Sequence, residues 1–305
     1  MKVGFRRIAV LVGVLALIAA SCGDDPAPPA GGNGDDAAEE TVCATYDTEA
    51  GDLLAQICSE GEIRVSTDPA YPPQSELNPE TGEYEGFDID VALEIADRLG
   101  VEVAWETPDW EVLTAGGWND RWDMSVGSMT PTNERQEVLD FTEPYAYVPA
   151  VVVVHEDSTA SDVTTDLDGK EIGFCASCTY EFFVDKSLNI SGFEFDFVID
   201  DAKGTGYDTD TTALQDLALG DGTRLDAVMT SEPTAVAFAE ENPVKIVGDP
   251  VFGEPLAVAF DKDAELDGAT LQEEVDRIVA DMHADGTLSQ LSEKWYDGID
   301  VTTLD

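Results

Sequence analysis

The sequence SVGSMTPTNERQ (residues 125–136) combines the end of a short strand, a loop rich in hydrogen-bond donors and the start of a helix. Thr132 is a suitable N-cap, with Arg135 in the first helical turn. Hydroxyl groups, backbone amides and a guanidinium that converge on one point suit a small carboxylate, because arginine can bind both oxygens at once. The chain holds only 15 Lys and Arg against 65 Asp and Glu. We therefore predict that Arg135 belongs to an anion site, rather than being a surface residue on a capped helix.

Strand and helix patterns alternate along most of the chain. The expected strands include residues 63–67, 101–105, 151–154, 172–174 and 226–229. The expected helix over residues 88–99 would bury Ile89, Ala92, Leu93, Ala96 and Leu99. Two later helices would begin with capping boxes at Thr270 and Thr287. This alternation predicts an α/β fold with mainly parallel sheets covered by helices, and ligands at the carboxyl ends of strands.

The N-terminus has the pattern of an export signal. In residues 1–21, three basic residues precede an apolar run that is short for a membrane span, and small residues lead to Cys22. The segment resembles a bacterial lipoprotein signal, which is cleaved before Cys22 so that this cysteine is acylated. Residues 22–42 are rich in Pro, Gly, Ala and acid, which predicts a disordered tether. The protein would then be lipid-anchored on the outer face of the cytoplasmic membrane.

The chain is very acidic, with a formal net charge of −50. A surface of this charge repels nucleic acid and anionic lipid, so we expect neither as a partner. It could concentrate cationic solutes near the protein. Extreme acidity more often reflects solubility, however, and by itself it says little about the ligand.

Four cysteines remain beyond the acylation site. An even number outside the cytoplasm suggests two disulfides, and proximity in sequence favours Cys43–Cys58 and Cys175–Cys178. Other pairings stay open, and Cys175-Ala-Ser-Cys178 could also be a redox pair or half of a metal site. The two histidines lie far from other candidate ligands, so we predict no metal and no other cofactor.

Six collinear segments between about residues 61 and 296 resemble the bacterial solute-binding proteins of family 3, the polar amino-acid receptors of ABC importers. The segments are Val65-Ser-Thr-Asp68-Pro-Ala-Tyr71-Pro-Pro73, Gly86-Phe-Asp-Ile-Asp90, residues 122–135, Val138-Leu-Asp-Phe-Thr142 with Pro144-Tyr145, Leu225-Asp-Ala-Val228 and Met282-His-Ala-Asp-Gly-Thr287. The resemblance implies a two-lobed periplasmic-binding-protein fold of type 2. Two mixed, mainly parallel sheets flanked by helices would be joined by two crossover strands.

The resemblance also implies where the lobes lie in the sequence. Lobe 1 would comprise residues 61–151 and 252–305, and lobe 2 residues 152–251. Residues 43–60 would form an N-terminal segment stapled by a disulfide. The two lobes would close over a ligand by a hinge motion, because contacts to both lobes stabilise the closed state.

A carboxylate-binding group follows from the same resemblance. Arg135 would clamp the ligand α-carboxylate, with help from Thr130 and from Thr179 across the cleft. Ser128 would meet the α-ammonium through its carbonyl or its hydroxyl. A structural alternative for Thr179 is that it only caps a helix.

Three further residues would contact the ligand side chain. Tyr71 and Trp110 match the aromatic positions that sandwich it, and Asp68 matches a position at its far end. Tyr71 and Trp110 could instead be core residues, as aromatics usually are. Asp68 precedes a proline and could merely start a turn.

The sequence departs from the family pattern at two places. Ser231 stands where the family usually has an aspartate for the α-ammonium, with Glu232 next to it. Since a buried ammonium needs a carboxylate partner, either Glu232 takes over or the ligand lacks a standard amine. Ser231 could also be only the N-cap of a helix beginning near Pro233. Gln74 replaces a common phenylalanine, which would make the pocket entrance more polar.

These observations favour a monomeric receptor that captures a small zwitterion, most simply a polar amino acid, and delivers it to an ABC permease in the membrane. We expect no enzymatic activity, because no catalytic constellation is present. One alternative is a lyase on the same scaffold, similar to cyclohexadienyl dehydratase, with Asp68, Glu111 or Glu232 as general acid or base. Another is the ectodomain of a sensor.

Overall fold

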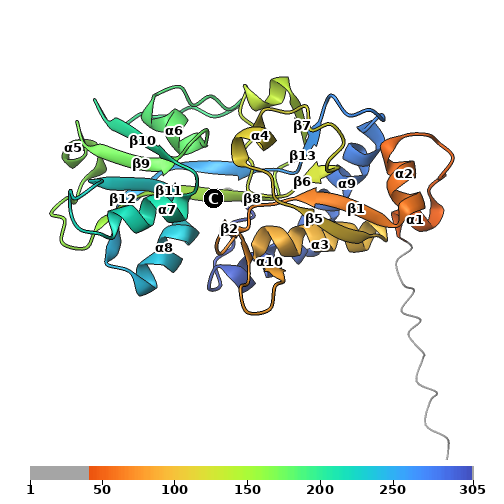
Figure 1. Cartoon of the computed structure of the whole chain (residues 1–305), viewed down its shortest axis with the longest axis horizontal. Coiled ribbons are helices and arrows are strands. Elements are labelled where there is room, and N and C mark those ends of the chain that lie inside the picture. Colours follow the sequence, from red (N-terminus) through yellow and green to blue (C-terminus); the bar gives the residue numbers. More distant parts are fainter. Residues whose placement is uncertain (1–40, 304–305) are drawn as a thin grey trace, which may run out of the picture. The chain divides into compact units, whose positions relative to one another are not determined.

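The computed structural model describes residues 41–303 of the 305-residue chain. The predicted signal peptide, Cys22 and most of the predicted tether lie outside the described residues. Two five-stranded sheets with flanking helices form two lobes (Figure 1). The predicted α/β fold of the type 2 periplasmic-binding-protein class is therefore confirmed. The residue boundaries that we assigned to the segments and lobes stay a prediction.

The first sheet has the strand order β5-β1-β6-β13-β7. Strand β1 is parallel to both of its neighbours, whereas β13 is antiparallel to both of its own. The strands are β1 (Glu62–Ser66), β5 (Glu102–Glu106), β6 (Met124–Ser125), β7 (Leu139–Phe141) and β13 (Ala259–Asp261). The expected strands at residues 63–67 and 101–105 are thus present within one residue.

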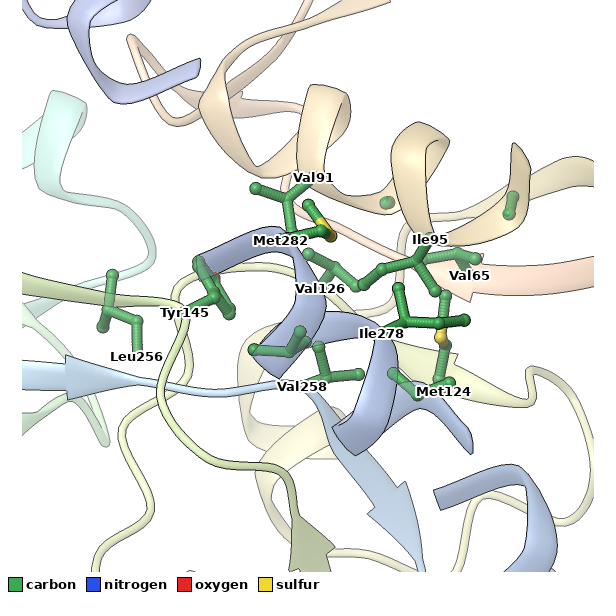
Figure 2. Close-up of a cluster of buried hydrophobic side chains, with 14 of the residues drawn as sticks. Val65, Val91, Ile95, Met124, Val126, Tyr145, Leu256, Val258, Ile278 and Met282 are labelled. Carbon is green, nitrogen blue, oxygen red and sulfur yellow. The ribbon is translucent and has the colours of Figure 1, made fainter. Parts of the chain in front are cut away.

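Helices α3 (Phe87–Leu99), α9 (Ala269–Asp285) and α10 (Thr287–Trp295) supply buried side chains to the core of this lobe. Figure 2 shows Val91 and Ile95 of α3 and Ile278 and Met282 of α9 packed around side chains of the sheet. A separate cluster around Trp118 and helix α4 (Trp110–Thr114) completes the first lobe.

The second sheet has the strand order β10-β9-β11-β8-β12. Its strands are β8 (Ala146–His155), β9 (Glu171–Cys175), β10 (Lys203–Tyr207), β11 (Ala227–Ser231) and β12 (Val244–Leu256). Successive side chains of β8 enter different cores, because a strand alternates between the two faces of its sheet. Val152 and Val154 pack with helix α6 (Thr179–Val184), and Val151 and Val153 with helices α7 (Asp210–Leu217) and α8 (Glu232–Glu241). Burial on both faces explains why this strand is a continuous run of valines.

Strands β8 and β12 connect the lobes. They pair antiparallel along most of their length, with an irregularity between Val247 and Phe252. Ala146 and Val148 belong to the core of the first lobe, whereas Ala150 belongs to that of the second. The two strands therefore pass from one lobe into the other side by side.

The remaining elements are short. They are the three-stranded sheet β2 (Ala70–Tyr71), β3 (Ser75–Leu77) and β4 (Tyr84–Glu85), helices α1 (Val42–Thr45), α2 (Leu53–Glu60) and α5 (Val163–Asp166), and the 3-10 turn η1 (Arg135–Glu137). Gly86 precedes α3 at φ 137°, where an added Cβ would collide with the backbone of Gln74. The Gly86 position therefore needs glycine both for its backbone angle and for space.

Three expectations about helices are wrong in detail. Leu93 is 45% exposed, since α3 buries Val91 and Ile95 instead. The threonines Thr270 and Thr287 lie inside α9 and α10, and glycines occupy both N-cap positions. The helix expected after Thr132 is a single 3-10 turn, although the Thr132 hydroxyl does accept a hydrogen bond from the Arg135 amide at 3.2 Å.

Helix α3 offers a matched pair of stability variants. We expect Ile95→Ala to lower the free energy of unfolding by about 2–4 kcal/mol, because it leaves a cavity in the core. Leu93→Ala removes a similar side chain from the exposed face and should change it by less than about 0.5 kcal/mol. Guanidinium denaturation of both variants gives the two values. Equal losses would show that α3 does not bury the Ile95 face.

Candidate functional site

A pocket lies between the two lobes. Its walls come from the loops after β1, β6, β9 and β10, from the starts of α4, α6 and α7, and from β12. Including the part open to solvent, it encloses about 500 Å³. Seven of the nine predicted ligand contacts line it, namely Asp68, Tyr71, Trp110, Ser128, Thr130, Arg135 and Thr179.

Arg135 is the buried cation of this pocket. Only 4% of the residue is exposed. Its Nη1 donates to the carbonyl of Thr130 and its Nη2 to the carbonyl of Ser177, each at 2.9 Å. Burial lowers the pKa of Arg135 to about 10, while the carboxylates of Glu254 and Glu134 act in the opposite direction. The side chain is therefore charged at neutral pH and joins the first lobe to the second.

Trp110 supports the same contact. The guanidinium carbon of Arg135 lies 5.0 Å from the centre of the Trp110 ring, a cation–π distance. The indole Nε1 donates to the Ser177 carbonyl at 3.2 Å. One face of Trp110 is thus occupied by a protein side chain, and the residue also lines the pocket.

The hydroxyls of Thr130 and Thr179 both donate to Oε2 of Glu254, that of Thr130 at 3.1 Å. Glu254 lies on β12 and is 5% exposed. Burial raises the pKa of Glu254, and the hydrogen bonds from Thr179, Tyr180 and Thr130 partly offset this effect. A protein carboxylate therefore occupies the hydroxyl donors that we expected to serve the ligand.

Ser128 has the backbone conformation of a tight turn, with φ 53°. Its hydroxyl donates to Asp88 at 2.8 Å, and its amide donates to the hydroxyl of Tyr145 at 3.1 Å. Burial raises the pKa of Asp88 to about 7, against these hydrogen bonds. The hydroxyl proton of Ser128 is therefore engaged, while the hydroxyl oxygen and the Ser128 carbonyl can both still accept a hydrogen bond.

Tyr71 and Asp68 are two further predicted contacts, and both line the pocket. The hydroxyls of Tyr71 and Tyr180 lie 3.2 Å apart across the pocket. Asp68 accepts the amide of Ala70 at 2.7 Å, and burial raises its pKa. Asp68 therefore does begin a turn, and it also lines the pocket.

Ser231 and Glu232 do not line the pocket. Ser231 is the N-cap of α8, and its hydroxyl accepts from Nε2 of Gln74 at 2.8 Å and donates to Thr234 at 2.9 Å. Gln74 is fully buried, so the expectation that it makes the pocket entrance more polar is wrong. The two positions at which the sequence departs from the family pattern contact each other across the lobes.

Sequence reasoning missed five pocket residues besides Gly127. They are Tyr180, Asp208, Thr209, Asp210 and Glu254. The segment Asp208-Thr-Asp210 directly follows strand β10 and leads into α7, so the rule that placed the Arg135 loop at a strand end would also have found it. No local pattern marks Glu254, because its role depends on contacts with residues 75 and 124 positions away.

Two disulfides are present, between Cys43 and Cys58 and between Cys175 and Cys178. The first joins α1 to α2. The second joins the end of β9 to the N-cap of α6 and lines the pocket. It encloses Ser177, whose carbonyl receives both Arg135 and Trp110 and whose φ is 60°. The bridge thus constrains the loop that presents the Ser177 carbonyl to Arg135 and Trp110 of the first lobe.

Within residues 41–303, no group of three or more His, Cys, Asp and Glu side chains has a geometry suited to a metal ion. No helix in the same range is long and apolar enough to cross a membrane.

The chain belongs to the bacterial extracellular solute-binding proteins of family 3, whose model matches residues 63–298. Membership of this family implies a small-molecule ligand and a periplasmic or extracellular location. The L-cystine-binding protein TcyJ of Escherichia coli is 29% identical over 82% of this chain and 88% of its own. The L-arginine-binding protein of Pseudomonas aeruginosa is 26% identical over 80% and 91%, respectively. The predicted family is therefore confirmed.

A solved structure leads to the same family. An ancestral amino-acid-binding protein, described as a precursor of cyclohexadienyl dehydratase, matches with a TM-score of 0.68 and 29% identity over 80% of this chain and 99% of its own.

The disulfide beside the pocket can be tested without a ligand. Replacing both Cys175 and Cys178 by serine should free the Ser177 carbonyl from its turn, so that the Trp110 indole N–H exchanges faster with solvent. Nuclear magnetic resonance of the indole signals measures this exchange.

The Cys43→Ser/Cys58→Ser variant is the control. It should lower the free energy of unfolding by up to about 3 kcal/mol, as expected for a loop of this length, and leave the Trp110 signal unchanged. An unaltered Trp110 signal in the Cys175/Cys178 variant would contradict the role given to that bridge.

Proposed function

We propose that this protein is the lipid-anchored receptor of an ABC importer, which binds a small zwitterionic solute, most simply an amino acid, and delivers it to a permease. Names of related proteins support the solute class, since the relatives reported above are called binding proteins for L-cystine and L-arginine. Anchoring through Cys22 and delivery to a permease are parts of the proposal that follow from the sequence and the family.

The observation that carries the proposal is the buried guanidinium of Arg135 between the lobes. Arginine has five N–H donors, and the two hydrogen bonds to backbone carbonyls leave three for a ligand. Because the carbonyl of Ser177 belongs to the second lobe, a ligand carboxylate bound by Arg135 would be held where the lobes meet. Binding and closure would then favour each other, as in a hinge that ligand contacts stabilise.

The lyase alternative requires a general acid or base in the pocket. Of the three candidates, Asp68 lines the pocket, whereas Glu111 lines a neighbouring hollow and Glu232 lines neither. The named relatives are binding proteins, and we propose that this chain too is a receptor without turnover. Conversion of prephenate or arogenate by the purified protein would overturn this part of the proposal.

The proposal is tested by calorimetry with the twenty amino acids and by the variant Arg135→Ala. We expect one or more amino acids to bind. The variant should lower the affinity for the tightest-binding amino acid by about 100-fold, because a charge-assisted pair of hydrogen bonds is lost. The α-amide of the same amino acid, which lacks the carboxylate, should lose far less in the same variant.

Arg277→Ala is the matched control, since Arg277 pairs with Glu274 and Asp281 on the exposed side of α9. It should bind like the wild type. Failure of every amino acid to bind would overturn the ligand class, and an unchanged affinity in Arg135→Ala would overturn the site.

A further inference from the structure

Asp210 is a buried carboxylate in the pocket wall with an unsatisfied oxygen. It is the first residue of α7 and is 4% exposed. No described residue donates a hydrogen bond of ordinary geometry to its Oδ1. An unpaired buried carboxylate oxygen costs stability, and such a cost is usually offset by a ligand or partner.

The pocket lining contains more acidic than basic residues. Asp68, Asp208, Asp210 and Glu254 all line it, against the single cation Arg135. Glu254 is satisfied by two threonine hydroxyls, and Asp68 accepts one backbone amide. Asp210 is the buried acid of this group whose carboxylate has an oxygen without such a hydrogen bond.

The surroundings of Asp210 make this imbalance worse. Burial raises the pKa of Asp210 well above its usual value, and the charges of Glu254 and Asp68 raise it further. The backbone of Cys175 and the hydroxyl of Thr230 act in the opposite direction. Tyr71 and Tyr180 also face this region, and the nearby Asp210 contributes to raising the pKa of both. Among these neighbours, none carries a positive charge that pairs with Asp210.

We propose that Asp210 binds the ammonium group of the ligand, and that the ligand carries a net positive charge, as an amino acid with a cationic side chain does. This inference rests on the proposed function, in which Arg135 holds the carboxylate of the same ligand. Neither Ser231 nor Glu232 takes this role, since both lie outside the pocket lining and the Ser231 hydroxyl is already engaged. The positive charge on the ligand would balance the pocket acids that exceed the single positive charge of Arg135.

The charge of the ligand is tested by calorimetry with two sets of amino acids near neutral pH. The cationic set is lysine, ornithine and arginine, and the neutral set is citrulline and glutamine. Citrulline matches arginine in length but has a neutral urea in place of the guanidinium. We expect the tightest cationic amino acid to bind at least about tenfold more tightly than either neutral one. Equal or tighter binding of a neutral amino acid would overturn the inference.

The role of Asp210 is tested with the tightest cationic amino acid and its analogue that lacks the α-amine. Asp210→Asn should lower the affinity for the amino acid by about 30- to 100-fold and the affinity for the analogue by less than about threefold. Equal losses for the two compounds would show that Asp210 does not contact the ammonium. Asp216→Asn is the control, because Asp216 lies on the same helix but pairs with Arg224 at the surface. It should leave both affinities unchanged.

A purely structural role for Asp210 predicts a different result. If the fold needed this carboxylate, Asp210→Asn would lower the melting temperature of the free protein. Asparagine cannot ionise, and the folded state raises the pKa of Asp210, so the ionised form is disfavoured in the fold. We therefore expect the variant to melt at the same or a higher temperature at mildly alkaline pH, while its ligand affinity falls. A lower melting temperature would overturn the assignment.

The pH dependence of binding gives a further readout. An ammonium favours the ionised carboxylate, so binding lowers the pKa of Asp210 from its raised value in the free protein and releases a proton. Affinity should rise with pH until the pKa of the free protein is passed and then level off. The rise should be smaller in Asp210→Asn, with the remainder due to Glu254 and Asp68. A wild-type affinity that falls with rising pH would contradict the inference.

Binding of no amino acid at all contradicts the proposed function, whereas tight binding of a neutral amino acid contradicts only this inference.

Discussion

The contact on which the pocket depends is the buried guanidinium of Arg135 between two backbone carbonyls. One of these carbonyls, of Thr130, belongs to its own loop, and the other, of Ser177, belongs to the second lobe. Burying a charge is costly unless hydrogen bonds compensate, and both carbonyls and the ring of Trp110 supply that compensation. The compensation is complete only when the second lobe is in place. The same cation that is available to a ligand therefore also favours the closed arrangement.

Glu254 adds a second constraint at the hinge. It lies on one of the two strands that connect the lobes, and it holds the hydroxyls of Thr130 and Thr179 from opposite sides of the pocket. The carboxylate thus links a residue of each lobe from a strand that connects them. Its charge also supports the ionisation of Arg135. Glu254 on the connecting strand therefore interacts both with the cation Arg135 and with the pocket-wall hydroxyls of Thr130 and Thr179.

The sequence allowed the fold and half of the site to be predicted, for different reasons. The α/β class follows from the alternation of strand and helix patterns, which is a local property of the chain, whereas the two-lobed arrangement came from the resemblance to the family. Arg135 was found because it follows a donor-rich loop at the end of a strand, and the roles of Thr130 and Ser128 in the same loop came from the resemblance. Asp210 and Glu254 were missed because only the tertiary structure brings them to that loop. Leu93 was misplaced because α3 is apolar on more than one side, so that its spacing alone does not distinguish the exposed face.

The contact between Gln74 and Ser231 explains why the two departures from the family pattern occur together. An aspartate at position 231 would place a carboxylate beside the buried amide of Gln74 and next to the N-terminus of α8. With serine there, Gln74 donates to its hydroxyl and accepts from Thr234, so every group in this small interface is paired. Ser231 then supplies a hydrogen bond between the lobes and no charge for the ligand. A carboxylate for the ligand ammonium must consequently come from elsewhere in the second lobe, and α7 begins with one at the pocket wall.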